Sequence, residues 1–306
     1  MEVRKIPVAQ GLAWFRAAID IGARNPKAVF GASVLFIATL YGLAILLGVV
    51  AVALTRGGGD NAQPDGVLFA AIFVPLFIGL MVMMPVLIGG LMHVIREAEA
   101  GRPVRARDLF APMRSPRVRT LALLGLVQIG FAILGGVVAI AIAGADYWQD
   151  YFGAVRGAMG GQMPVVPQPR HPGLLMLVQL AYNYFTYAVM LFAVPLVLFS
   201  GQGIVESVRN ALRASVRNVG ANLVAAGLFV AGTVVAAVVM VLLSMLANVI
   251  GALVHPMVGT LLSMLILLAF VSALLVVLAG GAYLAWRDTF GGQSPSAPRP
   301  FNGIEV

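Results

Sequence analysis

The side chains best suited to bind a metal or to catalyse a reaction are scattered through this 306-residue sequence. Its histidines, His93, His171 and His255, lie far apart, so we predict no metal centre. The sequence contains no cysteine, which excludes disulfides and thiol chemistry. No serine stands with a histidine and an acid as a catalytic triad requires, and no phosphate-loop motif follows a strand. The sequence therefore predicts neither enzymatic activity nor a cofactor.

One group of polar side chains falls inside a long apolar segment. Gln179 and Asn183 are one helical turn apart, and Thr186 and Tyr187 continue the same side. In the functional interpretation, these side chains line a polar cavity for a small solute or a lipid headgroup. In the structural interpretation, which we favour, the amides form hydrogen bonds between neighbouring helices, each worth about 0.6–2 kcal/mol.

Composition indicates which elements must carry these residues. Hydrophobic residues make up 60% of the chain, charged residues only 10%, and the mean hydropathy is +0.97. Apolar runs longer than the ~20 helical residues that cross a bilayer recur through the sequence. They predict an all-α, polytopic membrane protein with six transmembrane helices, near 28–54, 67–95, 120–145, 174–200, 219–248 and 256–284. The first run follows 27 polar or amphipathic residues, so we predict an uncleaved anchor there and no signal peptide.

The basic residues are divided unequally between the two predicted sides of the membrane. Seventeen lie on the side that holds both termini, and three lie on the other side, namely Arg56, Arg156 and Arg170. The positive-inside rule therefore predicts that both termini are cytoplasmic. The formal net charge of +8 then acts on anionic lipids of the cytoplasmic leaflet, and no nucleic-acid partner is needed to explain it.

Amphipathic helices are predicted at 8–24 and 203–217, directly before the first and fifth spans. Apolar residues recur along one face of each helix: Val8, Leu12, Phe15 and Ile19 in the first, and Ile204, Val208, Leu212 and Val216 in the second. Arginines follow another face: Arg16 and Arg24 in the first helix, and Arg209, Arg213 and Arg217 in the second. Such helices lie in the headgroup layer with arginines near lipid phosphates. In the functional interpretation, these arginines form a lipid- or partner-facing surface. In the structural interpretation, which we favour for the helices themselves, each helix is an interfacial anchor that sets the depth of the spans.

Two parts of the sequence repeat each other. Residues 16–38 align with 209–231 at an offset of 193, with Arg24-Asn25 matching Arg217-Asn218. GGLMHVIRE at 89–97 also resembles GGAYLAWRD at 280–288. These matches predict parallel internal repeats at 8–97 and 203–288, and Pro195 with the polar lead-in before the third span suggests a further unit at 103–201.

The predicted organisation is a single six-span membrane domain over 1–288, followed by a disordered cytoplasmic tail over 289–306. The glycine pairs at 89–90 and 280–281 are expected to let the second and sixth spans pack closely together. Residues 146–173, rich in glycine and proline, are expected to form an outer loop whose aromatic residues suit the membrane interface.

Three short motifs resemble a known family. They are RNP at 24–26, GRPVRARDLF after the second span and GIVESVRNALRASVRN after the fourth. The chain is similar over about residues 5–288 to bacterial six-span proteins whose pattern is shared with the membrane domain of glycerophosphoryl diester phosphodiesterases. The resemblance implies an integral, multi-pass protein of the bacterial inner membrane. The phosphodiesterase domain itself is missing, so that activity is not implied.

These observations favour a non-enzymatic envelope module that acts through anionic membrane lipids or a membrane protein partner. The alternative is an uncoupled carrier or channel for a small solute, which would use Gln179 and Asn183. A continuous wet cavity that reaches these two amides would favour the carrier, whereas a packed bundle would favour the module.

Overall fold

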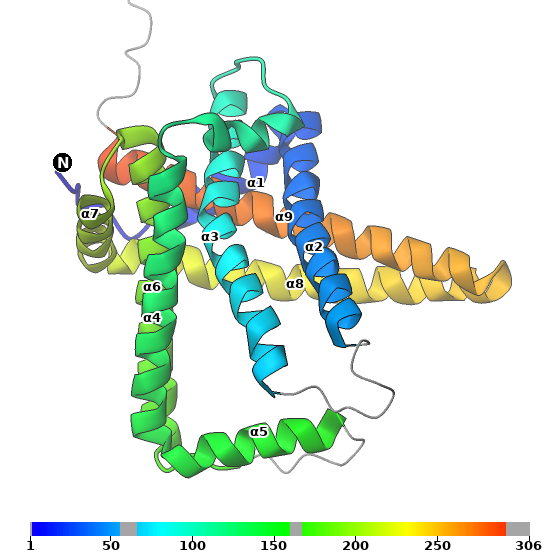
Figure 1. Cartoon of the computed structure of the whole chain (residues 1–306). Helices are drawn as coiled ribbons and strands as arrows, with labels where there is room; N and C mark the ends of the chain where they lie inside the picture. Colours follow the sequence, from blue (N-terminus) through cyan, green and yellow to red (C-terminus); the bar gives the residue numbers. More distant parts are fainter. Residues whose placement is uncertain (1, 56–65, 160–166, 292–306) are drawn as a thin grey trace, which may run out of the picture. The chain divides into compact units, whose positions relative to one another are not determined.

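The structure, a computed structural model, describes residues 2–55, 66–159 and 167–291. In chain order its elements are α1 (Gln10–Arg24), α2 (Pro26–Thr55), α3 (Gly66–Glu99), the 3-10 helix η2 (Ala106–Arg114), α4 (Val118–Ala143), α5 (Ala145–Met159), α6 (Pro172–Ser200), α7 (Ile204–Arg217), α8 (Val219–Leu253) and α9 (Pro256–Phe290) (Figure 1). No strand occurs in these described ranges. The predicted all-α class is confirmed.

Six of these helices are long and apolar enough to cross a membrane, namely α2, α3, α4, α6, α8 and α9. Their limits agree with the predicted spans, and the last two continue a few residues further than predicted. The chain therefore has the helices of a multi-pass membrane protein. Thr289 and Phe290, which we predicted in the tail, belong to α9, and Gly291 caps this helix. The other tail residues, 292–306, lie outside the described ranges.

Local sequence explains where several helices begin and end. Pro172 and Pro256 occupy the first turns of α6 and α9, where a missing backbone N–H loses no helical hydrogen bond. Gly201 ends α6 with a φ of 68°, in the left-handed region that glycine adopts without strain. A single residue separates each short amphipathic helix from the following span: Asn25 between α1 and α2, and Asn218 between α7 and α8.

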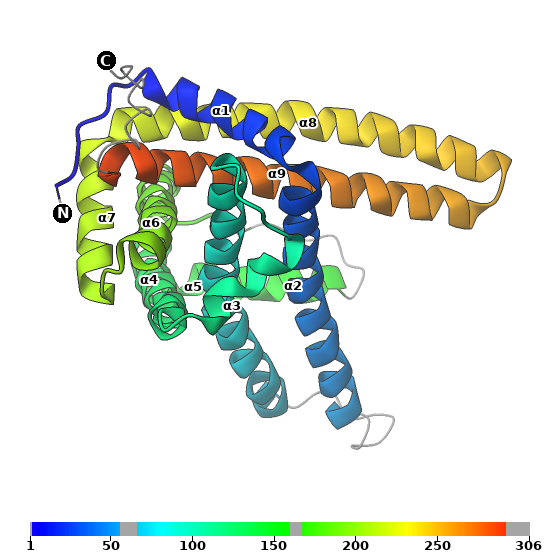
Figure 2. The same cartoon turned by 90° about the horizontal axis from the view of Figure 1, so that it is seen from above.

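The chain divides into two compact units. The first holds the described residues of Met1–Val34, Leu91–Asp108 and Arg213–Val306. In it, α8 and α9 run side by side as a hairpin, and α1 packs along both (Figure 2). Glycine permits this contact, because a Cβ at Gly11 of α1 would lie 2.3 Å from the Ala221 carbonyl oxygen of α8.

The second unit holds the described residues of Leu35–Gly90 and Leu109–Leu212. Its most extensive contact joins α4 to α6, and α5 turns away at the end of that pair (Figure 1). Gly125 of α4 meets α3 closely, because a Cβ there would lie 2.2 Å from the Met81 carbonyl oxygen. The unit is thus held by helix contacts that need small residues.

Two expectations, one about the predicted outer loop and one about the glycine pairs, were wrong. Residues 145–159, expected in an outer loop, form the helix α5, because Tyr147, Trp148, Tyr151 and Phe152 recur with helical spacing on one face. The glycine pairs contact other neighbours than the predicted ones. A Cβ at Gly90 would meet Leu109 of η2, and a Cβ at Gly280 would meet Ala18 and Ile21 of α1.

Candidate membrane-surface site

The helix α7 presents three different faces. Its buried face consists of small or polar residues, namely Ser207, Asn210, Ala211, Ala214 and Ser215. Small side chains let a helix approach its neighbours closely, and the one large polar member is satisfied, because Asn210 Nδ2 donates to Gln202 Oε1 at 3.1 Å. This face attaches α7 to the rest of the protein.

The second and third faces of α7 are exposed and adjoin each other. Val205 and Val216 are 81% and 63% exposed, and Leu212 lies between them on the same stripe. Arg209, Arg213 and Arg217 follow the neighbouring face, and all three are exposed. Within the described part of the chain, none of these arginine side chains forms a hydrogen bond or an ion pair. We call the three arginines with Val205, Leu212 and Val216 the α7 surface.

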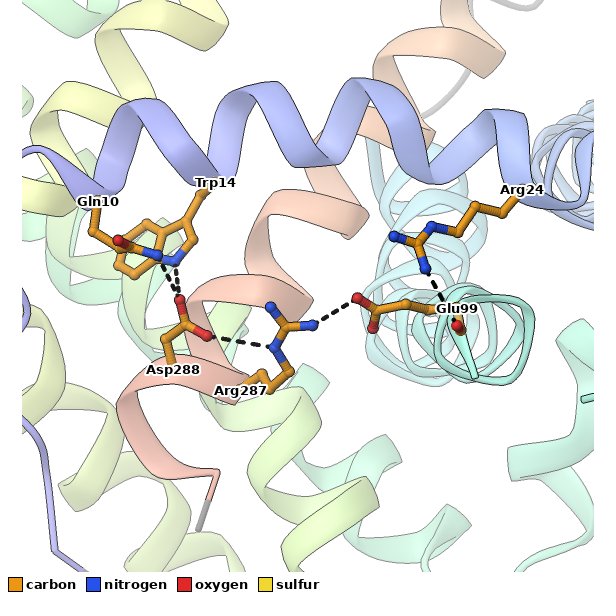
Figure 3. A network of polar contacts seen from close by, with 6 residues as sticks. All are labelled: Gln10, Trp14, Arg24, Glu99, Arg287 and Asp288. Carbon is orange, nitrogen blue, oxygen red and sulfur yellow. Dashed lines mark hydrogen bonds and ion pairs between the residues drawn. The ribbon is translucent and has the colours of Figure 1, made fainter. Parts of the chain in front are cut away.

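The helix α1 follows the same plan with fewer charges. Trp14, Ala18 and Ile21 are buried, whereas Leu12 and Ile19 are exposed. Arg16 and Arg24 are both exposed. Of these two side chains, only that of Arg24 has a partner within the described residues, the Glu99 carbonyl oxygen, which accepts a hydrogen bond from Nη1 at 3.4 Å (Figure 3).

Sequence reasoning recognised two faces of these helices and missed the buried one. At the offset of 193, each buried residue of α1 that follows has a buried counterpart in α7: Trp14 and Ser207, Ala18 and Ala211, Ile21 and Ala214, Gly22 and Ser215. The exposed arginines Arg16 and Arg24 likewise correspond to Arg209 and Arg217. The alignment at the offset of 193 was available from the sequence, but burial was not, and small residues on a helix face do not indicate a packing surface in a sequence this apolar.

A polar network connects α1, α9 and the end of α3 within the first unit (Figure 3). Asp288 accepts hydrogen bonds from Gln10 Nε2 at 2.9 Å and from Trp14 Nε1 at 2.8 Å. The neighbouring Arg287 pairs with Glu99, with 2.6 Å between Nη1 and Oε1. The sequence showed that GGLMHVIRE and GGAYLAWRD both end in an arginine followed by an acid. It did not show the partners of Arg287 and Asp288, which lie far away in the chain.

Glu97, the last residue of the repeated GGLMHVIRE segment, has a different partner. It pairs with Arg102 across the turn that follows α3, and Arg102 Nη2 lies 2.7 Å from Glu97 Oε1. This hydrogen bond raises the pKa of Arg102 above its usual value. The acids at this end of the first unit therefore neutralise particular arginines, in contrast to the uncompensated arginines of the α7 surface. Among the described residues, no three His, Cys, Asp or Glu side chains gather in a group that could hold a metal ion.

The amides predicted inside the membrane lie on α6 but do not act together. Gln179 is exposed and lines a groove between α4 and α6 with a volume of about 290 Å³, whereas Asn183 is half-buried outside it. Neither side chain has a hydrogen bond within the described ranges. The predicted bridging role belongs instead to Tyr182, whose hydroxyl donates to the Phe131 carbonyl oxygen of α4.

No family model, no curated protein and no solved structure matches this chain. The resemblance to the membrane domain of glycerophosphoryl diester phosphodiesterases therefore rests on its short motifs alone.

Proposed function

We propose that the protein is a non-enzymatic module of the bacterial inner membrane, with both termini in the cytoplasm, that acts by binding anionic lipids of the cytoplasmic leaflet. The α7 surface is its working surface in this proposal, and α1 supplies a weaker second copy. The alternative ligand of the α7 surface is a protein partner with an acidic surface near the membrane.

The observation that carries the proposal is the side-by-side placement of exposed apolar residues and uncompensated arginines on α7. A helix of this kind lies in the membrane interface, with its apolar stripe among acyl chains and its guanidinium groups at the phosphates. Each arginine near an anionic leaflet contributes about 1 kcal/mol. Glu206 is exposed on the same helix and reduces the positive charge by one, so the face remains strongly basic.

The matching burial of α1 and α7 supports the proposal that the same interfacial helix occurs twice in the chain. The two helices bury corresponding positions and expose corresponding arginines, and each is followed after one asparagine by a long apolar helix. In α1, however, Asp20 takes the position that Arg213 holds in α7. We therefore assign the stronger lipid binding to α7.

The carrier alternative has less support. The groove at Gln179 has one other polar lining side chain, Tyr182, whose hydroxyl is already bonded to α4. The rest of its lining is apolar, so the groove offers no polar route for a hydrophilic solute. We keep the lipid module as the proposal.

The test uses the full chain in nanodiscs that contain phosphatidylcholine and phosphatidylglycerol. The variant that combines Arg209→Gln, Arg213→Gln and Arg217→Gln should no longer enrich phosphatidylglycerol over phosphatidylcholine. The enrichment is measured by mass spectrometry of the lipids that stay bound when the protein is transferred from nanodiscs to a mild detergent. At about 1 kcal/mol per arginine, the apparent affinity should fall by up to roughly two orders of magnitude.

A matched control changes three other exposed arginines, Arg105, Arg107 and Arg114, to glutamine. This control removes the same charge from the same predicted side of the membrane, and enrichment should largely persist. Equal losses in the two triple variants would show that only total charge matters, and no loss in the α7 variant would refute the α7 surface as a lipid site.

A cellular experiment separates the module from the carrier. The pair Gln179→Leu and Asn183→Leu should leave any deletion phenotype complemented, whereas the α7 triple variant should not complement it. If the leucine pair abolishes complementation at unchanged protein level and melting temperature, and the α7 variant complements fully, the carrier replaces the module.

A further inference from the structure

The groove between α4 and α6 is shaped by a close contact between these two helices. Gly135 of α4 makes room for the ring of Tyr182, because a Cβ at position 135 would lie 2.5 Å from the ring carbon Cζ. The Tyr182 hydroxyl then reaches the Phe131 carbonyl oxygen and fixes the ring against α4. The groove walls beside it are apolar, formed chiefly by Leu134, Val138, Leu175, Val178 and Phe185.

Gln179 distinguishes this groove from an ordinary lipid-facing surface. Its side chain is exposed, and its amide has no hydrogen-bond partner within the described chain. The neighbouring Leu177 and Leu180 are both largely exposed, so the surrounding surface suits hydrocarbon. A primary amide without a partner is unfavourable in hydrocarbon, so an external group should accept or donate a hydrogen bond there.

A basic side chain lies beyond one end of the groove. Arg170 directly precedes α6, and its backbone N–H donates to the Ala143 carbonyl oxygen at the end of α4 at 3.1 Å. Its guanidinium pairs with Asp146 at 3.3 Å, but both side chains are largely exposed, so this ion pair is weak. The positive charge therefore remains accessible where the α4–α6 pair ends.

The helix α5 indicates that this end lies at headgroup level. Tyr147, Trp148, Tyr151 and Phe152 form one continuous aromatic face, with neighbouring ring centroids 5.4–6.2 Å apart. Polar residues, including Asp146, Gln149 and Asp150, occupy the opposite face. Tyrosine and tryptophan are enriched where a membrane meets water, and an amphipathic helix that turns away from the spans lies along that boundary (Figure 1).

We propose that the α4–α6 groove binds one phospholipid molecule. Its acyl chain lies along the apolar walls, an ester carbonyl accepts a hydrogen bond from the Gln179 amide, and its phosphate lies near Arg170. Gln179 lies seven positions after Pro172, the first residue of α6, or roughly 10 Å along the helix, and Arg170 precedes Pro172 by two residues. This site involves other helices than the α7 surface and does not depend on the proposed function.

The experiment uses the full chain in nanodiscs with a phosphatidylglycerol that carries a photoreactive diazirine on its acyl chain. Crosslinked peptides are mapped by mass spectrometry, and intact protein is weighed to count retained lipids. We expect labels within residues 134–139 and 175–182, and one more retained phospholipid in the wild type than in Gln179→Leu. Gln179→Leu, which removes the amide at an exposed position, should reduce groove labelling at least fivefold, and Val138→Trp should abolish it by filling the groove.

Leu177→Trp provides the control, because Leu177 is exposed on α6 but does not line the groove. It should label like the wild type. Melting temperatures of all variants separate a lost site from a lost fold, and Gln179→Leu keeps the test valid if Val138→Trp unfolds. Equal labelling of wild type and Gln179→Leu would overturn the proposal. So would a stable dimer that places Gln179 against a second copy without lipid.

Discussion

Asn218 holds the backbone of Ile6, whose N–H donates to the Asn218 Oδ1 at 2.9 Å. The Asn218 Nδ2 in turn donates to the Arg4 carbonyl oxygen at 3.0 Å. The Arg4 N–H donates to the Thr289 carbonyl oxygen at the end of α9 at 3.1 Å. The break between α7 and α8 and the end of α9 therefore bind the backbone of the N-terminal segment.

Replacing Asn218 by alanine should release this N-terminal segment. Asn218 is only 2% exposed, so the variant loses two sheltered hydrogen bonds and leaves their backbone partners unsatisfied. We expect the free energy of unfolding to fall by about 1–3 kcal/mol, and trypsin to cut faster at Arg4 and Lys5. The matched control is Asn25→Ala, which removes only a local bond from the Ala28 N–H at 3.3 Å. Faster cleavage in the control as well would contradict the tether.

The two glycines of the first pair should respond oppositely to alanine. At Gly90 a Cβ would lie 1.8 Å from the Leu109 carbonyl oxygen, which belongs to the backbone and cannot turn aside. We expect Gly90→Ala to lower stability by about 1–3 kcal/mol or more. At Gly89 the nearest atoms are side-chain carbons at 3.5 Å, an ordinary contact distance.

Gly89→Ala should therefore be neutral or stabilising, because alanine favours a helix over glycine by about 1 kcal/mol. Thermal melting of both variants in the same detergent checks the contrast. Similar melting temperatures for the two variants would show that η2 does not contact α3 at Gly90.

The Glu99–Arg287 pair should show measurable coupling. The Glu99 side chain is 17% exposed and that of Arg287 is 44% exposed, so water screens the pair only in part. A double-mutant cycle with Glu99→Gln and Arg287→Gln should give a coupling energy on the order of 1 kcal/mol, and added salt should reduce it. A coupling near zero at low salt would mean that the network does not hold α9 to the end of α3.

The buried faces of α1 and α7 should tolerate added volume equally poorly. Ala18 and Ala211 are both fully buried at corresponding positions. We expect Ala18→Leu and Ala211→Leu each to lower the free energy of unfolding by about 1–3 kcal/mol. Leu12→Ala and Val205→Ala change exposed positions and serve as controls with little effect on melting. Tolerance at one alanine and not at the other would argue against a duplicated packing arrangement.

Reporter fusions test the predicted orientation. The unequal distribution of basic residues predicts periplasmic activity for fusions at residues 60 and 160, and cytoplasmic activity at 108, 210 and 300. The fusion at 108 is the most informative, because it lies within the predicted loop with the most arginines. A periplasmic signal there would reverse the proposed orientation and remove the α7 surface from the anionic leaflet.

The sequence by itself determined the class of the protein and the positions of its long helices. A span through hydrocarbon needs about 20 apolar residues whose backbone groups bond within one helix, so local composition is enough to find it. Pro256 at the start of α9 and Gly201 at the end of α6 mark helix limits through their own backbone chemistry. The sequence also predicted the arginine face of α7, because helical spacing alone assigns these residues to one side of a helix.

Only the tertiary structure decided which surfaces meet. Ser207 and Ala211 form a packing face because their small size admits a neighbour, yet small residues occur on many helix faces in this chain. The partners of Asp288 also escaped sequence reasoning, since Trp14 lies 274 residues away. Hydropathy describes how each helix interacts with its solvent, whereas contacts between helices depend on shape and on pairs of distant polar groups, which no local pattern encodes.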